Sequence, residues 1–415
     1  MDTLEGALET VPMVGTAPWT ASLNRQLSIT GVPLSEALKA MVIDAFWPLP
    51  DQNCDNVLKQ ILYFEPYFNH FQKEYRNPSK PSIAIQSYED MVALLRIIKS
   101  NSTQSLNHLL TTIRTTALAT HITTATDERL LSSIEFIVRC WLMINVNVVN
   151  DMPEKPPQQY PYPKPRVKEL PWLRTESLAQ TIRKNLDPYG YGSGGAEDGQ
   201  QASWPVSPMG KLRQGKVPET DEFSPYLNVV DMERIAGFKI NWTNTLAEHL
   251  TLRRKYLYLF SQVTALRRLE QSGTSRGILP DGLIEETLET MNLLIPIESA
   301  ACNKWLKRQT QKHGLDDPLH FRDYRNGSPD RDVERFRYWR ERLLKLSDVF
   351  MRTKPQSPIG WWYDDRDKGY WWNYWLVFGA LACTVLFGLL SVILGFLQLD
   401  VAKKQLNSEQ KQAGL

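Results

Sequence analysis

The chain has 415 residues and a formal net charge of +2, and 42% of its residues are hydrophobic. A chain of this length and composition can bury one or two sizeable cores. A charge balance this close to neutral gives no indication of nucleic acid or another strongly charged partner.

The first segment, residues 1–32, is predicted to be a flexible N-terminus. It carries Asp2, Glu5 and Glu9 where a secretory signal would have a basic region, and no apolar run follows them. We therefore expect no signal that sends this end across a membrane. The cysteines are Cys54, Cys140, Cys302 and Cys383. They are far apart and form no C-x-x-C pair, which fits a reducing compartment.

Residues 33–150 are predicted to form a helical domain. YEDMVALLRIIKS begins at Tyr88, and SLNHLLTTIRTTALATHI begins at Ser105. The strongest predicted helix begins at the capping sequence Thr126-Asp127-Glu128 and continues to Val149, with apolar residues at steps of four and three. Each helix has an apolar face that needs a partner, so a small bundle is the simplest arrangement.

Residues 151–225 are predicted to form a Pro/Gly-rich linker. Its prolines include Pro153, Pro156, Pro157, Pro161, Pro163, Pro165 and Pro171. This composition is typical of polyproline II segments. A short helix is expected from Glu176 to Asn185, and YGYGSGGAEDGQ follows it from Tyr189 as a loop.

Residues 226–352 are predicted to form a second helical region. Its expected helices are WTNTLAEHL near Asn241, a basic helix that ends near Gly273, residues 283–294, NKWLKRQTQKH after Pro296, and a run from Ser328-Pro329 to Phe350. Between the first two, RKYLYLFSQV can pass through an extended segment. Ser328 followed by Pro329 is typical of a helix start, so we expect the last helix to begin there.

Residues 375–399 are predicted to be a transmembrane helix, because no charged side chain occurs between Trp375 and Leu399. At about 1.5 Å per residue this helix covers roughly 37 Å, more than the roughly 30 Å of bilayer hydrocarbon. A buried core helix is the alternative. Residues 400–415 form a short C-terminal tail. Because so few residues follow the span, we expect a tail anchor with the N-terminal bulk in the cytosol.

Residues 353–374 are predicted to be an aromatic juxtamembrane belt, because Trp and Tyr prefer the headgroup level of a bilayer. The expected membrane-interface residues are Trp361, Trp362, Tyr363, Tyr370, Trp371, Trp372, Tyr374 and Trp375. Small residues also recur on one face of the span, where a second helix could approach closely. They are Ala380, Thr384, Gly388, Ser391 and Gly395, and they predict self-association.

The sequence gives little indication of a catalytic or metal-binding site. In HGLDDPLH, His313 and His320 flank Asp316 and Asp317, a combination that can bind zinc or iron but is also common in solvated loops. No known catalytic fingerprint occurs in a fitting context, so we expect no catalytic residue, cofactor or metal. The basic residues Arg335, Arg337, Arg340 and Arg342 could contact anionic lipid, or could line an ordinary solvated helix face.

Three segments follow one another in the second half: W-T-x-x-L-A-x-H-L at 242–250, F-x-x-W-R-x-R-L at 336–343, and W-W-x-D-x-R at 361–366. In this order they resemble a large family of uncharacterised fungal single-pass membrane proteins. The resemblance implies one C-terminal membrane helix. It assigns no reaction, so no residue becomes catalytic through it. The segment RKYLYLFSQVTAL departs from the F-H-H type that the family often shows.

Together these features predict a mostly α protein: a helical bundle plus a second helical region, with one C-terminal transmembrane helix. We expect a membrane-anchored cytosolic interaction or signalling scaffold whose partners are the lipid bilayer and unidentified cytosolic proteins. Two alternatives stay open. One is a membrane-tethered enzyme of unrecognised family, and the other is a lipid-surface or membrane-contact regulator.

Overall fold

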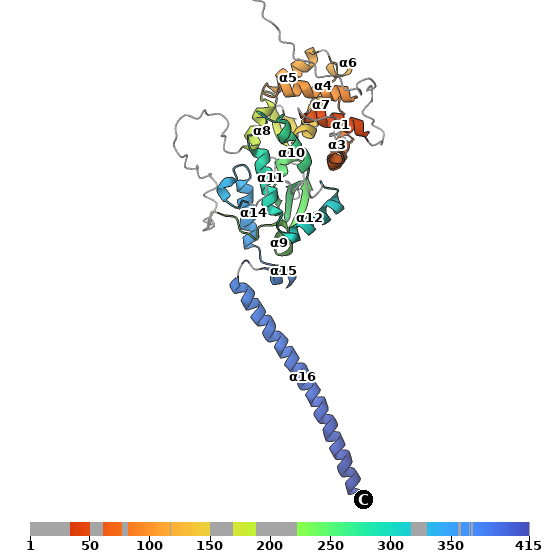
Figure 1. The fold of residues 1–415 in the computed structure, drawn as a ribbon, viewed down its shortest axis with the longest axis vertical. Coiled ribbons are helices and arrows are strands. Elements are labelled where there is room, and N and C mark those ends of the chain that lie inside the picture. Colours follow the sequence, from red (N-terminus) through yellow and green to blue (C-terminus); the bar gives the residue numbers. More distant parts are fainter. Residues whose placement is uncertain are drawn as a thin grey trace, which may run out of the picture.

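The structure is a computed structural model, and it describes residues 34–49, 61–76, 82–116, 118–149, 169–187, 222–316, 330–355, 358–364, 366 and 368–414. These residues are mostly helical, as predicted. The described residues up to 355 form a folded head, and one long helix, α16, projects from it (Figure 1).

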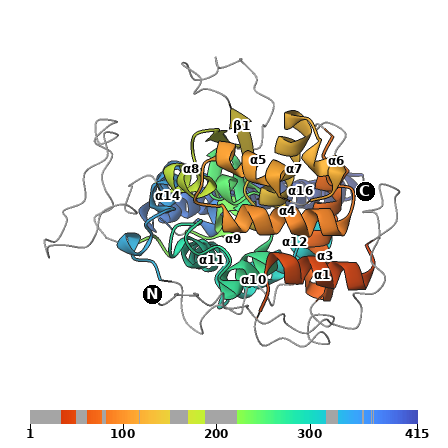
Figure 2. The same cartoon turned by 90° about the horizontal axis from the view of Figure 1, so that it is seen from above.

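The N-terminal part of the head is built from helices. They are α1 (Glu36–Phe46), the 3-10 turn η2 (Ile61–Phe64), α3 (Glu65–Tyr75), α4 (Tyr88–Ser100), α5 (Leu106–Thr115), α6 (Thr120–Thr123) and α7 (Asp127–Leu142). Ser87 and Asp90 form a capping box that begins α4, and Thr126 caps α7 as its sequence predicts. Helix α4 packs against both α5 and α7 (Figure 2).

Two helices of this part are shorter than predicted. α5 ends at Thr115 because Thr116 turns to an extended backbone, and the short α6 follows. α7 ends at Leu142 because Met143 adopts a left-handed conformation with φ of 55°. Residues Val146–Val149 then form strand β1, which pairs in parallel with β2 (Leu170–Leu173). The β-branched valines favour this strand over a further turn of helix.

The next described elements are helices, two 3-10 turns and three strands. They are α8 (Leu178–Leu186), α9 (Val229–Arg234), β3 (Lys239–Thr243), η4 (Leu246–Glu248), β4 (Thr251–Arg253), β5 (Tyr256–Phe260), α10 (Val263–Ser272), α11 (Leu283–Leu294), α12 (Ala300–His313), η5 (Val333–Arg335) and α14 (Arg340–Arg352). The predictions of α8, α11 and α12 are confirmed, and α10 ends at Gly273 in a left-handed cap as expected.

The helix expected near Asn241 is wrong. Residues 239–243 form β3, which pairs in parallel with β5, while β4 pairs antiparallel on the other side of β5. Only three residues of WTNTLAEHL, Leu246–Glu248, are helical, and they form a 3-10 turn. Pairing with β5 gives the backbone of β3 its hydrogen bonds, which outweighs the helix-like spacing of the apolar residues.

One hydrophobic core runs through the whole head, from Leu38 in α1 to Phe350 in α14. Polar contacts cross between the two predicted helical regions. The Arg268 guanidinium donates to the Trp47 carbonyl at 3.0 Å, and the Trp141 indole donates to Thr274 Oγ1 at 3.4 Å. Leu246 N–H donates to the Met143 carbonyl at 2.8 Å. The N-terminal helices and the small sheet therefore support one another.

A buried hydrogen-bonded chain connects the sheet to α11 and α14. His249 accepts the Phe260 N–H at Nδ1 (3.2 Å), so its Nε2 donates to Thr290 Oγ1 (2.7 Å). The Trp339 indole donates to Thr287 Oγ1 (2.9 Å), and its ring meets the His249 ring edge-on at 5.0 Å. Burial lowers the pKa of His249 to about 3, so this ring is neutral at ordinary pH.

Helix α14 begins at Arg340, so the predicted start at Ser328-Pro329 is wrong; those two residues themselves lie outside the described ranges. The buried Glu286 carboxylate of α11 accepts the backbone N–H groups of Tyr338 (3.0 Å) and Trp339 (2.7 Å). It therefore binds the N–H groups of the N-cap residue, Trp339, and of the residue before it, just ahead of the first turn of α14. Burial raises the pKa of Glu286, against the opposing effect of these donors.

Arg342 joins the first turns of α14 to the turn that follows η4. Its guanidinium donates to the carbonyls of Ala247 (3.0 Å) and His249, and lies 4.9 Å from the Trp339 ring centre. Burial lowers its pKa to about 10, which still leaves it charged at neutral pH. The charge is thus stabilised by carbonyl oxygens and an aromatic face in place of water.

Replacing Arg342 should therefore destabilise the head. Arg342→Met keeps an apolar stem but leaves buried carbonyl groups without their donor, so we expect the free energy of unfolding to fall by about 2 kcal/mol. Denaturant unfolding of the full-length protein in detergent measures this. Lys345→Gln, on an exposed position of the same helix, should stay within about 0.5 kcal/mol of the parent. Equal losses in the two variants would contradict the role assigned to Arg342.

Candidate functional site: the membrane helix and its junction with the head

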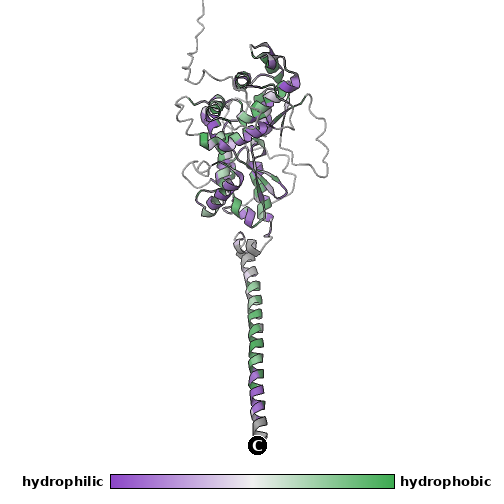
Figure 3. Ribbon diagram, turned by 90° about the vertical axis from the view of Figure 1, so that its right-hand side faces the viewer, coloured by the Kyte–Doolittle hydropathy of each residue, from purple (hydrophilic) through white to green (hydrophobic). Residues whose placement is uncertain are grey.

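Helix α16 (Lys368–Ala413) is the most prominent feature outside the head. Its 46 residues extend about 69 Å at about 1.5 Å per residue. Within the described part of the chain it is the one helix long and apolar enough to cross a membrane, and none of its apolar window is buried. The long apolar stretch and the polar end beyond it are visible in Figure 3.

The helix does not stop at the end of the predicted span. It continues through the predicted tail to Ala413, with an i, i+4 ion pair between Asp400 and Lys404 (2.8 Å). Along residues 375–399 its apolar side chains are exposed, among them Phe387 and Phe396. An apolar surface this large is stable in lipid but not in water. A single-pass membrane anchor is thus compatible with the structure.

The predicted aromatic belt is divided between two helices. Trp361 and Tyr363 belong to the short helix α15 (Pro358–Tyr363), whereas Trp372 and Trp375 belong to α16. Trp372 is exposed, and the Trp375 ring packs against Phe378 at 5.5 Å. The side chains of Trp362, Tyr370, Trp371 and Tyr374 lie outside the described ones. The belt prediction itself therefore stays a prediction.

Arg366 fastens the start of the membrane helix to the head, in an arrangement that we call the clamp. Its guanidinium bonds both oxygens of Asp364 (2.7 and 2.9 Å) and donates to the carbonyls of Phe350 and Thr353 at the end of α14. Both charged side chains are largely buried. A bidentate pair that also satisfies the last carbonyls of a helix is both strong and directional.

Helix α15 packs against α9 next to the clamp. The Arg234 guanidinium lies 4.1 Å from the Tyr363 ring centre, a cation–π contact. Asp231 of α9 is close enough to Arg366 and Asp364 to interact with both electrostatically, although burial dominates and raises its pKa. Part of the predicted belt, at Tyr363, thus contacts the protein.

The small-residue face of the span is left uncovered. Ala380, Thr384, Gly388 and Ser391 are exposed, Gly395 is partly exposed, and the Thr384 hydroxyl donates to the Ala380 carbonyl at 2.8 Å within the helix. A Cβ added at Gly388 or Gly395 would have no described atom within 4 Å beyond its chain neighbours and the nearby backbone of its own helix. Self-association through this face stays a prediction.

The Arg-rich segment is engaged in contacts within the head. Arg335 pairs with Glu289 (2.6 Å), Arg337 pairs with Asp187 (3.1 Å), and Arg342 is bound to backbone carbonyls. Arg340 also interacts with other groups of the protein. These arginines stabilise the fold, so the segment offers little charge for a lipid surface. The sequence did not indicate this, because their acidic partners are far away along the chain.

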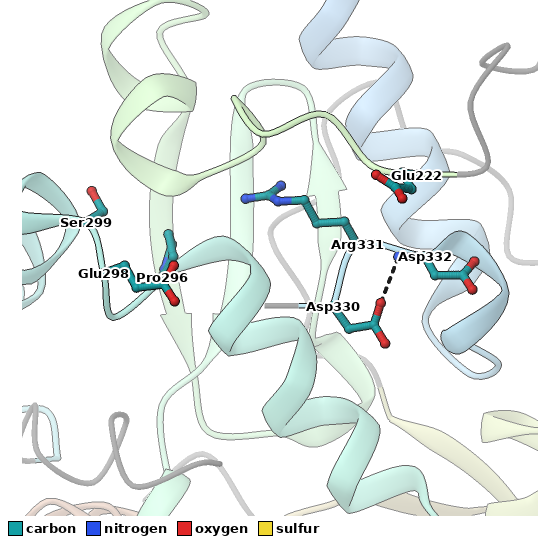
Figure 4. Close-up of a pocket in the computed structure, with 7 residues that line it drawn as sticks. All are labelled: Glu222, Pro296, Glu298, Ser299, Asp330, Arg331 and Asp332. Atoms are coloured by element: carbon teal, nitrogen blue, oxygen red, sulfur yellow. Dashed lines mark hydrogen bonds between the residues drawn. The ribbon is translucent and has the colours of Figure 1, made fainter. Parts of the chain in front are cut away.

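A pocket of about 590 Å³ lies between the start of α12 and the segment before η5. It is lined by Glu222, Pro296, Glu298, Ser299, Asp330, Arg331 and Asp332 (Figure 4). Arg331 donates to the Ser224 carbonyl at 2.6 Å and so has a structural role. Among the described residues no group of three His, Cys, Asp or Glu side chains could hold a metal ion.

A second polar group lies at the carboxyl ends of the parallel strands β3 and β5, where α/β sheets often bind ligands. The Asn244 side-chain oxygen accepts from Ser261 (2.7 Å) and Gln262 (2.7 Å), and its amide nitrogen meets His70 Nδ1 (3.1 Å). Gln262 is 4% exposed, and its Oε1 has no hydrogen-bond partner among the described residues. Sequence reasoning missed this group because His70 comes from α3.

No family model, curated protein or solved structure matches this chain. The fungal resemblance therefore stays a prediction that rests on its three motifs. The first two motifs lie together in the head, and the third contacts it. His249 of the first packs on Trp339 of the second, and Arg366 of the third binds the end of the helix that the second begins. The residues that carry the resemblance thus act as structural contacts.

Of the HGLDDPLH residues, Asp316 has a defined role, whereas Asp317 and His320 lie outside the described ranges. Asp316 is 1% exposed and accepts the Thr264 N–H (2.6 Å) at the start of α10. Burial raises its pKa to about 7, although these backbone donors oppose the rise. The folded state therefore holds the proton more tightly than the unfolded state, whose pKa is near the ordinary 3.8.

It follows that the contribution of Asp316 to stability is greatest in acid and is lost as the pH rises from about 4 to about 7. Asp316→Asn keeps an acceptor for Thr264 and does not titrate. Relative to the parent, this variant should gain stability across the same window, measured by thermal unfolding at several pH values. Asp330→Asn makes the same charge change at an exposed position and should show no such trend. A difference between parent and Asp316→Asn that is independent of pH would contradict the assignment.

Proposed function

We propose that this protein is a single-pass membrane protein whose helical head lies in the cytosol and acts as an interaction or signalling scaffold. The observation that carries the proposal is the apolar helix α16, joined to the head through the Arg366 clamp. A folded head of this size, held at a fixed place on a bilayer, can present surfaces to other proteins. The uncovered small-residue face adds a route to dimers.

The cytosolic position of the head is supported by its cysteines and sequons. Cys140 and Cys302 are buried and in no disulfide, which suits a reducing compartment. Among the N-x-S/T sequons, the Asn101 side-chain amide donates to the Ile97 carbonyl (2.9 Å), and Asn241 lies within β3. Asn241 is therefore not placed in a loop as a glycosylation site would be, whereas Asn101 begins the turn that follows α4. Asn326 lies outside the described ranges.

A membrane-tethered enzyme is the second candidate, and the polar group around Asn244, Ser261 and Gln262 is the observation that favours it. A buried amide oxygen without a partner beside a neutral hydroxyl can hold a water molecule or a small polar ligand. The single proton of the Ser261 hydroxyl is within hydrogen-bond distance of the Thr243 carbonyl (3.0 Å) and of Asn244 Oδ1 (2.7 Å), so these acceptors orient the hydroxyl and a general base does not. The scaffold is therefore the better-supported proposal.

Protease protection on intact microsomes tests the orientation. With one epitope before Met1 and another after Leu415, we expect the first to be digested and the second to be protected, because α16 crosses the bilayer with the head outside. Detergent should expose both epitopes. Protection of the head, together with a mobility shift that endoglycosidase removes and that Asn101→Gln lowers, would place the head in the lumen and contradict the proposal.

A further inference from the structure

Side-chain contacts, one backbone hydrogen bond and the register of the sheet together show which end of the head faces α16. The clamp and the Arg234–Tyr363 contact hold α9 beside α15. Phe238 N–H donates to the Met232 carbonyl (3.1 Å), so β3 begins against α9. In the register of the sheet, Lys239 lies opposite Tyr256, and Tyr256 lies opposite Arg253. The turn between β4 and β5 is therefore at the same end as α9 and α15.

This end of the sheet carries exposed cationic side chains: Lys239, Arg254 and Lys255. Tyr256 is 40% exposed beside them, with its ring 5.7 Å from the Lys239 ammonium group. We call these four residues the basic tip. A tyrosine ring among lysines and arginines suits a bilayer interface, where the ring lies at headgroup depth and the cations meet phosphate.

Four carboxylates of the elements around the basic tip are engaged within the protein. Glu248 bonds Arg253 (3.0 Å), Asp364 bonds Arg366 (2.7 Å), and Asp348 bonds Arg352 (2.6 Å). Glu233 accepts from the Trp305 indole at 2.7 Å, and burial raises its pKa. With these carboxylates engaged, the exposed Lys239, Arg254 and Lys255 give this end of the sheet a positive surface.

Helix α12 extends this positive surface. It packs on α9 with Cys302, Trp305 and Leu306 buried, and its sequence contains no acidic residue. Its exposed positions include Lys304, Lys307 and Arg308. Basic side chains thus continue from the tip along the side of the head.

We propose that the basic tip binds the headgroups of anionic phospholipids in the leaflet that α16 enters. The proposal rests on the cytosolic head proposed above, because the cytoplasmic leaflet is the anionic one. Charge complementarity and continuity with the membrane helix both favour lipid as the occupant. Contact at the tip, in addition to the clamp, would hold the head at a fixed angle to the bilayer.

Hydrogen exchange of the full-length protein in lipid nanodiscs tests this directly. The discs contain either phosphatidylcholine alone or phosphatidylcholine with 30% phosphatidylserine. With the anionic lipid we expect exchange at the amides of residues 252–257 to slow by about fivefold or more, since each basic residue near an anionic surface changes the docked-to-undocked ratio by about fivefold. High salt should remove the effect.

A charge variant and a matched control make the test specific. Lys239→Gln, Arg254→Asn and Lys255→Gln together should abolish the lipid-dependent slowing, with Asn chosen because residue 254 has a positive φ of 57°. The control combines Lys73→Gln, Arg76→Gln and Arg96→Gln, the same change of charge on exposed positions of the N-terminal helices, and should keep the slowing. Unchanged exchange within α7 shows that each variant is folded.

Three outcomes would overturn the proposal. The first is equal exchange in the two kinds of disc, and the second is slowing that persists in the tip variant. The third is slowing by an acidic peptide but not by phosphatidylserine, which would assign the tip to a protein partner. If the protein did not co-elute with the discs, the proposed membrane anchor would be contradicted as well. That result is distinguishable from one in which the protein enters the discs but its basic tip does not bind anionic lipid.

Discussion

Buried charged groups hold both ends of α14, and the position of the membrane helix relative to the head depends on them. At its start, Glu286 accepts backbone N–H groups and Arg342 binds the carbonyls that precede β4. At its end, the Arg366 guanidinium donates hydrogen bonds to the carbonyls of Phe350 and Thr353. A buried charge without its partners is costly, so each of these contacts restricts α14 to one arrangement. The helix thereby links the sheet to the residues that precede α16.

The local parts of the fold were predictable from the sequence. Capping residues and apolar periodicity located α4, the start of α7 and α11, because these signals act within one helix. β3 was not predictable, because its partner strand β5 decides its conformation and short apolar segments suit either state. The start of α14 was missed for a similar reason. Ser328-Pro329 is a local signal, whereas Glu286 acts from a distant helix.

The candidate site likewise has a part that the sequence predicts and parts that it does not. An uncharged run from Trp375 to Leu399 identifies an apolar helix by composition alone. The clamp could not be predicted, because Arg366 binds backbone carbonyls of Phe350 and Thr353, and no side-chain pattern marks such acceptors. The Arg-rich segment had two possible roles, contact with anionic lipid or an ordinary solvated helix face. The acidic partners of Arg335 and Arg337 come from α11 and from the end of α8, so only the fold shows that their charge is already paired.

A fixed head has a functional consequence. If the clamp and the basic tip both hold, the N-terminal helices always point away from the bilayer, where cytosolic proteins can reach them. If only the span attached the protein, the head would rotate freely and present no consistent surface. The scaffold proposal therefore depends on how rigidly α14 is joined to α16.

Pulsed electron spin resonance between α14 and α16 measures this most directly. Spin labels replace the exposed residues Lys345 and Val377, with Cys54 and Cys383 exchanged for Ser and Ala and the two buried cysteines retained. In nanodiscs we predict one narrow distance distribution for the parent and a broad one for Arg366→Gln. Arg352→Gln, which breaks only an exposed pair, should stay narrow. A parent distribution as broad as that of Arg366→Gln would contradict the account.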